Sequence, residues 1–316
     1  KRNDHPVGKA DHPSGGVLRG GQAPVRGSDH PGEAESGSAP GCGLGGTTGL
    51  AAGAAIEPPM PELPEVETLC RQLRTVIVGR DILSLQVIDP KLKHLPPLEG
   101  REVRFVDRHG KRMVWMLSDG QCLLFQLRMT GRLFWLEEGE LPAHARLVFF
   151  FPDGRLVLSD PRRFATVELS SPPAASTVAD GLEPLEPKRL ADASRGRRLP
   201  VKSFLMDQRV VAGIGNIYAS EILHKAGIDP MRPASGLRPA EWKRIASAAA
   251  RILVEAVGSR GTSISDWRDL HADRGEYQHR LRVYGRKGER CGKCRGQIRR
   301  VVIAGRSTFY CPACQK

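Results

Sequence analysis

Residues 60–69 read MPELPEVETL, and this stretch decides how the folded part of the chain begins. Apolar side chains recur after it at helical spacing, at Val66, Leu69, Cys70 and Leu73. Pro64 suits the first turn of such a helix, because a backbone N–H is not needed there. The glutamates at positions 65 and 67 favour the positive end of the helix dipole. The pattern predicts an amphipathic helix that opens directly after Pro61 and Glu62.

Pro61 directly follows Met60. A proline that becomes the first residue, after loss of its methionine, carries a secondary amine that can attack an aldehyde carbon and form an iminium. Inside a chain the same nitrogen belongs to an amide and lacks this reactivity. Here 59 residues precede Met60, and the chain starts with Lys1 rather than Met. We therefore expect translation to begin at Met60 and the mature protein to begin at Pro61.

The segment 1–59 has an unusual composition. It contains 14 Gly and 7 Pro and lacks Phe, Trp and Tyr. Such a segment buries too little apolar surface to offset its ordering entropy, so we predict a disordered lead that is not part of the mature protein. It also lacks the charged, apolar and small-residue regions of a signal peptide.

The chain is basic, with 48 Lys+Arg against 35 Asp+Glu and a net charge of +13. Residues 60–316 hold 43 of these basic and 29 of these acidic residues, so the charge belongs to the folded part. This balance favours a nucleic-acid partner over a membrane, although composition alone also fits a merely basic soluble protein. The sequence contains no apolar run of 18 residues, so we expect no membrane span. Cysteine usage suits a reducing cytoplasm.

Two patterns divide the chain after the first helix. Short β-type runs come first, at 82–89, 102–106, 112–117, 121–129, 146–151 and 155–159. The last two are joined by the turn Pro152–Asp153–Gly154, and together the runs predict an antiparallel sandwich or barrel. After about residue 185 helical patterning replaces them, at 201–208, 217–226 and 239–257.

The C-terminal segment 283–316 carries the strongest local signal. Two Cys-x2-Cys pairs stand sixteen residues apart, formed by Cys291, Cys294, Cys311 and Cys314. Four thiolates close a tetrahedral site and leave no position for water, which predicts one structural Zn²⁺. A redox dithiol or an iron–sulfur site is the alternative. The arginines between the pairs suit phosphate contacts, although a protein-binding ribbon would carry the same pattern.

Several motifs in one order extend over residues 60–316. They are PELPEVET, RHGKR at 108–112, LRMTG at 127–131, DPRRF at 160–164, GIGNIYASE at 213–221, VYGRKG at 283–288 and CPACQK at 311–316. On these motifs the chain closely resembles bacterial formamidopyrimidine-DNA glycosylase. The resemblance implies an α+β multidomain fold with an N-terminal antiparallel β-sandwich, a helix–two-turns–helix domain and a C-terminal four-cysteine zinc finger. We expect their boundaries at 60–185, 186–282 and 283–316.

The resemblance also implies catalytic roles. Pro61 matches the nucleophile, Glu62 the general acid, Lys111 the lysine that assists base loss and β-elimination, and Arg306 the arginine of δ-elimination. Without the resemblance, Pro61 would be a helix-entry residue, Glu62 a carboxylate at the helix dipole and Lys111 a solvated turn residue.

Further positions match contacts to damaged double-stranded DNA. Met129, Arg162 and Phe164 resemble the residues that fill the helix after the damaged base is flipped out. The ordinary alternative makes Met129 and Phe164 core residues, and Arg162 or Arg163 a salt-bridge partner of Asp160. The remaining expected DNA contacts are His144, Arg163, Arg198, Lys202 and Asn216. Residues 262–282 match a mobile loop that closes over the flipped base.

The expected function is therefore excision of oxidised purines with strand cleavage, by a monomer in the bacterial cytoplasm. A sister group of glycosylases that removes oxidised pyrimidines is one alternative. A non-catalytic DNA-binding protein is another, if residues 1–59 stay attached and Pro61 has no amine. A zinc-ribbon scaffold is a third, but it leaves Lys111 and the DPRRF segment without a role.

Overall fold

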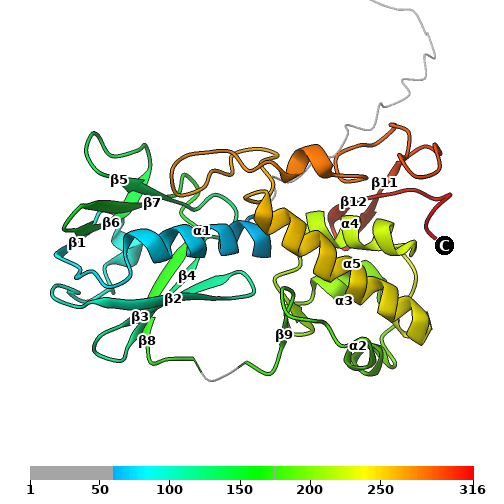
Figure 1. Cartoon of the computed structure of the whole chain (residues 1–316), viewed down its shortest axis with the longest axis horizontal. Helices are drawn as coiled ribbons and strands as arrows, with labels where there is room; N and C mark the ends of the chain where they lie inside the picture. The colour runs from blue at the N-terminus through cyan, green and yellow to red at the C-terminus, as the bar shows by residue number, and fades with distance from the viewer. Residues whose placement is uncertain (1–59, 174–175) are drawn as a thin grey trace, which may run out of the picture. The chain divides into compact units, whose positions relative to one another are not determined.

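The structure, a computed structural model, describes residues 60–173 and 176–316, which belong to one compact unit. The disorder predicted for residues 1–59 lies outside the described residues. Helix α1 (Leu63–Val76) comes first, and two sheets, a group of helices and a cysteine-bearing hairpin follow (Figure 1). Over the described residues, no helix is both long enough and apolar enough to span a membrane.

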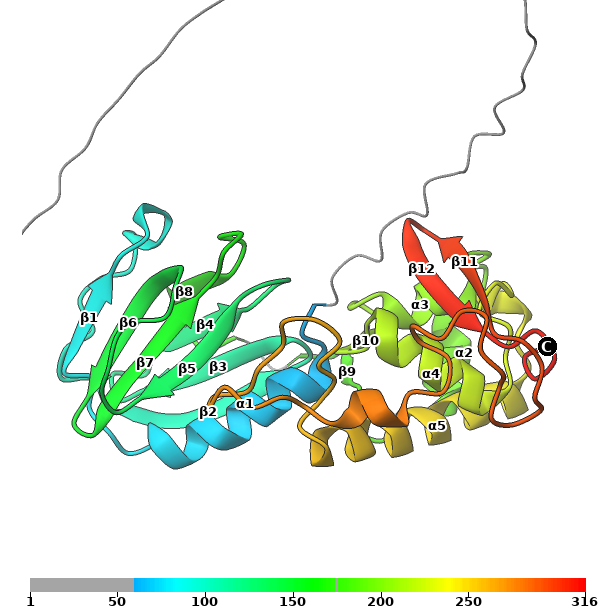
Figure 2. The ribbon, with the colours of Figure 1, turned by 90° about the horizontal axis from the view of Figure 1, so that it is seen from above.

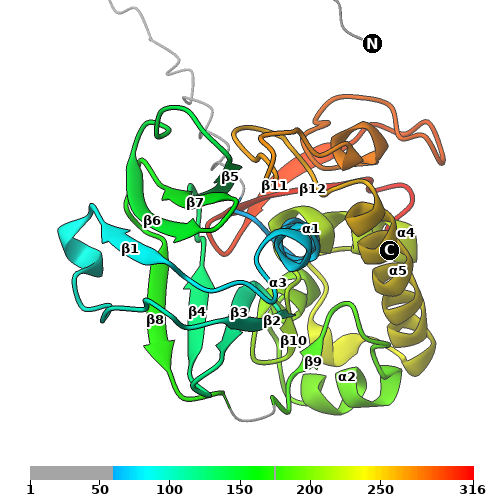
Figure 3. The same ribbon diagram turned by 60° about the vertical axis from the view of Figure 1, so that its left-hand side comes forward.

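Helix α1 forms as the sequence predicts. The Glu62 backbone N–H donates to the Glu65 carboxylate over 2.8 Å, which satisfies one of the open donors at the helix start. Pro64 lies in the first turn, and the apolar stripe from residue 66 to residue 73 is buried. Helix α1 contacts both strand β2 (Val103–His109) and helix α5 (Pro239–Gly258), so it lies between the sheets and the helices (Figure 3).

Two four-stranded antiparallel sheets pack into a sandwich. One sheet has the order β1 (Ser84–Val87), β6 (Ala145–Phe151), β7 (Gly154–Ser159), β5 (Arg132–Leu136), and the other has the order β2, β3 (Arg112–Leu117), β4 (Cys122–Gln126), β8 (Thr166–Ser170). The buried rings of Trp115, Phe125 and Phe149 come from both sheets, with centroids 4.3 to 6.0 Å apart. A shared core between two separate sheets confirms the sandwich over the barrel.

The six predicted strands are present, although the predicted segment 121–129 stops at Gln126. The sequence patterns miss β5 and β8, each five residues long. Most side chains of β5 are only half-buried, so its apolar alternation is weak.

The helical part starts with a short parallel pair, β9 (Ala179–Asp180) and β10 (Val211–Ala212). The three predicted helices correspond to α3 (Val201–Met206), α4 (Asn216–Ala226) and α5, while α2 (Pro187–Ser194) was not predicted. Gly227 ends α4 with φ 71°, a left-handed conformation that glycine adopts without strain. The short helix η2 (Ala234–Gly236) lies between α4 and α5.

After α5 the chain runs back over α1 towards the sandwich before it forms the short helix η3 (Tyr277–Arg280) (Figure 1). Leu270 is buried in the sandwich core, and its carbonyl accepts a hydrogen bond from the Trp135 N–H over 2.9 Å. The chain then forms the hairpin of β11 (Arg299–Ile303) and β12 (Arg306–Tyr310). This hairpin and α5 lie on opposite sides of the helical domain (Figure 2).

Candidate functional site

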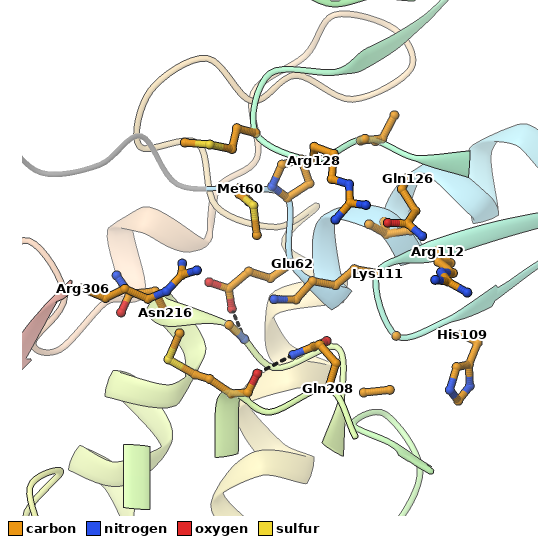
Figure 4. Close-up of a pocket in the computed structure, with 18 of the residues that line it drawn as sticks. Met60, Glu62, His109, Lys111, Arg112, Gln126, Arg128, Gln208, Asn216 and Arg306 are labelled. Atoms are coloured by element: carbon orange, nitrogen blue, oxygen red, sulfur yellow. Dashed lines mark hydrogen bonds between the residues drawn. The ribbon is translucent and has the colours of Figure 1, made fainter. Parts of the chain in front are cut away.

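A cavity of about 670 Å³ lies at the start of α1, between the sandwich and the helical domain. Its walls come from α1, the β2–β3 hairpin, the segment after β4, the start of α4 and the tip of the β11–β12 hairpin (Figure 4). The predicted site residues that line it are Pro61, Glu62, Lys111, Met129, Asn216 and Arg306. Residues up to 245 positions apart in the chain therefore share one cavity.

The Glu62 side chain reaches the N-terminus of α4. Its carboxylate accepts hydrogen bonds from the backbone N–H groups of Gly215 at 2.7 Å and Ile217 at 2.8 Å. A Cβ at Gly215 would lie 2.3 Å from the Glu62 Cδ, so only glycine allows this approach. Burial raises the pKa of Glu62, although the Lys111 charge and these amides oppose the rise. The group can therefore hold a proton inside the cavity.

Glu65 is a second buried carboxyl one turn further along α1. It accepts hydrogen bonds from the Tyr218 hydroxyl at 2.6 Å, the Thr262 N–H at 2.7 Å and the Glu62 N–H at 2.8 Å. Burial, followed by the nearby Glu62 charge, raises the pKa of Glu65 to about 7. From the sequence, Glu65 was predicted only as a carboxylate at the helix dipole. Its position three residues after Glu62, the spacing of a capping box, was the available signal.

Lys111 lies on the two-residue turn between β2 and β3, and its side chain extends towards Glu62 (Figure 4). Gly110, the other turn residue, has φ 58°. Burial lowers the pKa of Lys111, Glu62 opposes this and Arg306 adds to it. Arg306 is exposed at the first position of β12. Two cations thus face the carboxyl of Glu62 across the cavity.

At the surface, Arg162 contacts both Met129 and Phe164. The Arg162 guanidinium lies 4.6 Å from the centre of the Phe164 ring, and its Nη1 lies 3.5 Å from the Met129 sulfur. Phe164 is 45% exposed, so it is not a core residue. The buried Asp160 carboxylate holds the loop by accepting the N–H groups of Phe164 and Ala165, both at 2.7 Å.

The alternative prediction, a salt bridge from Arg162 or Arg163 to Asp160, is wrong. Asp160 pairs with Arg146 at 3.3 Å, and Arg163 pairs with Asp89. Arg163 is nevertheless half exposed at its side chain, and His144 is exposed with φ 62°. Both remain available at the surface for a partner.

Lys202 was expected at the DNA-facing surface, but it is 1% exposed. Its ammonium donates to the Asn216 side-chain oxygen at 2.5 Å, the Thr308 hydroxyl at 2.7 Å and the Ser307 carbonyl at 3.2 Å. Burial lowers the pKa of Lys202 to about 7. The three oxygens offset part of the cost of burying the ammonium by accepting its hydrogen bonds. Lys202 therefore fixes the half-buried Asn216. Arg198 is exposed, as expected of a surface contact.

The four cysteine sulfurs of Cys291, Cys294, Cys311 and Cys314 lie within 4.8 Å of one another. Four soft sulfur donors at one point fit a tetrahedral metal site with no open position. Buried His224 places its Nε2 3.3 Å from the Cys291 sulfur and so joins α4 to this cluster. His224 was not predicted from the sequence, because its place on a buried helix face resembles that of a core residue.

Three family descriptions match successive parts of the chain. They are the formamidopyrimidine-DNA glycosylase N-terminal domain at residues 60–167, the formamidopyrimidine-DNA glycosylase H2TH domain at 180–267, and the zinc finger found in FPG and IleRS at 288–316. The fold and the cavity between its domains thus define a DNA glycosylase with a zinc-finger domain.

Individual relatives agree. The formamidopyrimidine-DNA glycosylase of Chloroflexus aggregans is 40% identical, over 81% of this chain and 98% of the relative. A mutant of the Lactococcus lactis FPG, solved in complex with Fapy-dG containing DNA, has a TM-score of 0.74 and 31% identity, covering 81% of this chain and all of that one. The Thermus thermophilus MutM (FPG) protein also has a TM-score of 0.74, at 35% identity, over 81% of this chain and 98% of that one.

The chain belongs to the formamidopyrimidine-DNA glycosylase family of base-excision repair enzymes, which are bifunctional glycosylases and abasic-site lyases.

Proposed function

We propose that the chain removes oxidised purines, namely 8-oxoguanine and formamidopyrimidines, from duplex DNA and then cleaves the strand at the abasic site. The observation that carries this proposal is the meeting of Pro61, Glu62 and Lys111 in one cavity. A nucleophile, a proton donor whose pKa is raised and an amine whose pKa is lowered are the groups that such a reaction needs.

The first stage is base loss. The Pro61 nitrogen, as a free amine, attacks C1′ of the damaged nucleotide, and the C1′–N bond breaks with its electron pair leaving on the base. Glu62 supplies a proton to the ring oxygen or the base, and Lys111 assists the departure. The nitrogen loses its proton, and its lone pair then opens the sugar ring by breaking the C1′–O4′ bond, which leaves an iminium ion (a cationic Schiff base) between Pro61 and C1′.

The second stage is strand cleavage. Removal of a proton from C2′, assisted by Lys111, breaks the C3′–O bond in β-elimination. A further proton loss from the sugar, assisted by Arg306, breaks the C5′–O bond in δ-elimination. The expected gap carries phosphates at both ends.

This chemistry requires the form that starts at Pro61, because the lone pair of an amide nitrogen is delocalised into its carbonyl. A free α-amino group has a pKa of about 8, which leaves a useful neutral fraction near physiological pH. The match to the family's N-terminal domain begins at residue 60, which supports this start. For the chain with a peptide bond on Pro61 we propose DNA binding without base excision.

The DNA partner is engaged in two ways in this proposal. Met129, Arg162 and Phe164 enter the stack and offset the cost of flipping the base, roughly a few kcal/mol. His144, Arg163, Arg198 and Asn216 contact phosphates, and Lys202 acts through Asn216.

One Zn²⁺ on the four cysteines would supply a structural crosslink that holds the β11–β12 hairpin and Arg306. We further propose a monomer that acts on the chromosome in the bacterial cytoplasm. The proposed domain boundaries are 60–185, 186–282 and 283–316.

The test is product analysis with protein that starts at Pro61. A duplex containing 8-oxoguanine should be cut to a gap with phosphate at both ends, and an undamaged duplex should stay intact. Cleavage of a thymine glycol duplex with no cleavage of the 8-oxoguanine duplex would instead assign the chain to oxidised pyrimidines. No cleavage of either duplex would contradict the proposal.

A further inference from the structure

The turn that carries Lys111 is held by a buried ionic network. The Arg108 guanidinium donates from Nη1 and Nη2 to the Asp180 carboxylate at 2.7 and 2.9 Å. Its Nε donates to the Glu67 carboxylate at 2.9 Å. The three side chains are only 6, 7 and 8% exposed. Pairs this deeply buried are screened little by solvent.

The same network contacts the turn backbone directly. The Gly110 N–H donates to Asp180 Oδ2 at 2.7 Å, and the Gly110 carbonyl accepts from Arg108 Nη1 at 3.1 Å. Both polar backbone groups of the residue before Lys111 are thus bonded to the ion pair. A Cβ at Gly110 would lie 2.9 Å from the Ala212 Cβ, so β10 also packs against the turn.

The partners come from elements that also build the cavity. Glu67 lies on α1, whose start carries Glu62, and Asp180 lies on β9, which pairs in parallel with β10. Asp180 is fixed further by the Leu182 N–H at 3.0 Å. The turn is therefore tied to the helix that begins at the nucleophile and to the strand pair that opens the helical domain.

We infer that Arg108 and Asp180 are positioning residues for Lys111, and this inference rests on the role proposed for Lys111. A lysine on a two-residue turn has a long flexible side chain, and its backbone must be fixed for its amine to meet a reacting sugar. The planar fork of Arg108 bonds Asp180 through two nitrogens and Glu67 through the third, which a lysine cannot do.

The experiment uses protein that starts at Pro61 and a preformed abasic-site duplex in single turnover. We expect Asp180→Asn and Arg108→Lys each to cut about 10- to 100-fold more slowly, because a shift of about 1 Å in a catalytic group has effects of this size. The dissociation constant for DNA should stay within about twofold of wild type, since neither residue lies in the proposed DNA contacts. Arg108→Lys keeps the positive charge but loses the planar fork. A slow rate in this variant therefore shows that the geometry of Arg108 matters, and not only its charge.

Arg71→Gln is the matched control. Arg71 also bonds Glu67, at 2.9 Å, but its side chain is 57% exposed and lies outside the turn. It should cut at the wild-type rate. Asp180→Asn could fail to fold, because the buried charge of Arg108 loses its partner. In that case the double variant Arg108→Leu with Asp180→Ala removes both buried charges, and Glu67 still has Arg71 as its ion-pair partner. The double variant should be as slow as the single ones.

The pH profile of the single-turnover rate gives a readout that a merely structural role would not move. In the Asp180, Arg108 and double variants, Lys111 should be displaced from Glu62, and the limb of the pH profile that depends on Lys111 should therefore shift. In Arg71→Gln this limb should stay where it is in wild type. Wild-type rates and profiles in the network variants would overturn the inference. Inactive wild-type protein would instead count against the proposed function.

Discussion

At the residue scale, the carboxyls of Glu62 and Glu65 both lie at the start of α1, and burial raises the pKa of each. They differ in what surrounds them. Glu62 faces the cavity and Lys111, whereas Glu65 is enclosed by Tyr218 and Thr262. This difference supports the proposed role of Glu62 as proton donor and suits Glu65, which bonds the Glu62 N–H, to a supporting role.

The raised pKa of Glu65 predicts a pH-dependent stability. The folded pKa is about 7 against an ordinary value of 4.5, so the folded state binds more protons between these values than the unfolded state. The contribution to the free energy of unfolding is fully present below about pH 4.5 and is lost as the pH rises through 7.

Glu65→Gln has no such titration. The unfolding free energy of wild type relative to this variant, measured by urea denaturation, should fall by roughly 3 kcal/mol from pH 4.5 to pH 7 and above. A difference that stays constant over this range would show that the pKa of Glu65 is not raised.

At the element scale, the start of α4 is shaped by Gly215. Because a Cβ there would meet the Glu62 carboxyl carbon at 2.3 Å, Gly215→Ala should displace Glu62 and slow 8-oxoguanine excision by about 100-fold. Gly236→Ala is the control, since nothing lies within 4 Å of its Cβ position. Single-turnover excision rates give the comparison, and equal rates for the two variants would refute the argument.

The cysteine hairpin is the second element with a prediction of its own. Cys311→Ser should release zinc and weaken DNA binding, because Arg306 loses its rigid support, while the sandwich stays folded. Cys122→Ser, at a cysteine of β4 outside the cluster, should retain zinc. Metal content, DNA affinity and near-ultraviolet circular dichroism of the sandwich tryptophans measure the three effects. Unchanged DNA affinity in Cys311→Ser would be evidence against this role.

Local sequence patterns were sufficient to predict α1, the β2–β3 hairpin and the four-cysteine site, because each of these depends on residues that are close in sequence. They were insufficient for Asp180, which meets Arg108 from 72 positions away. The burial of Lys202 was not predicted for the same reason. The oxygens that allow its burial lie 14 to 106 positions further along the chain.

At the scale of the whole molecule, the sandwich supplies Lys111 and Met129, the helical domain supplies Asn216, and the hairpin supplies Arg306 to one cavity at the start of α1. The order of motifs along the sequence predicted these residues through a family resemblance. Their convergence is a property of the packed domains, which no single segment encodes. In the proposed mechanism, the chemistry of the assembled cavity depends on one atom, the nitrogen of Pro61.

The most direct measurement is borohydride trapping on an 8-oxoguanine duplex, followed by mass mapping of the crosslinked peptide. Protein that starts at Pro61 should give an adduct that maps to the Pro61 nitrogen, and the 316-residue chain should bind the duplex without an adduct. No adduct from the Pro61 form, or an adduct of the full chain, would contradict the assignment of Pro61 as the nucleophile.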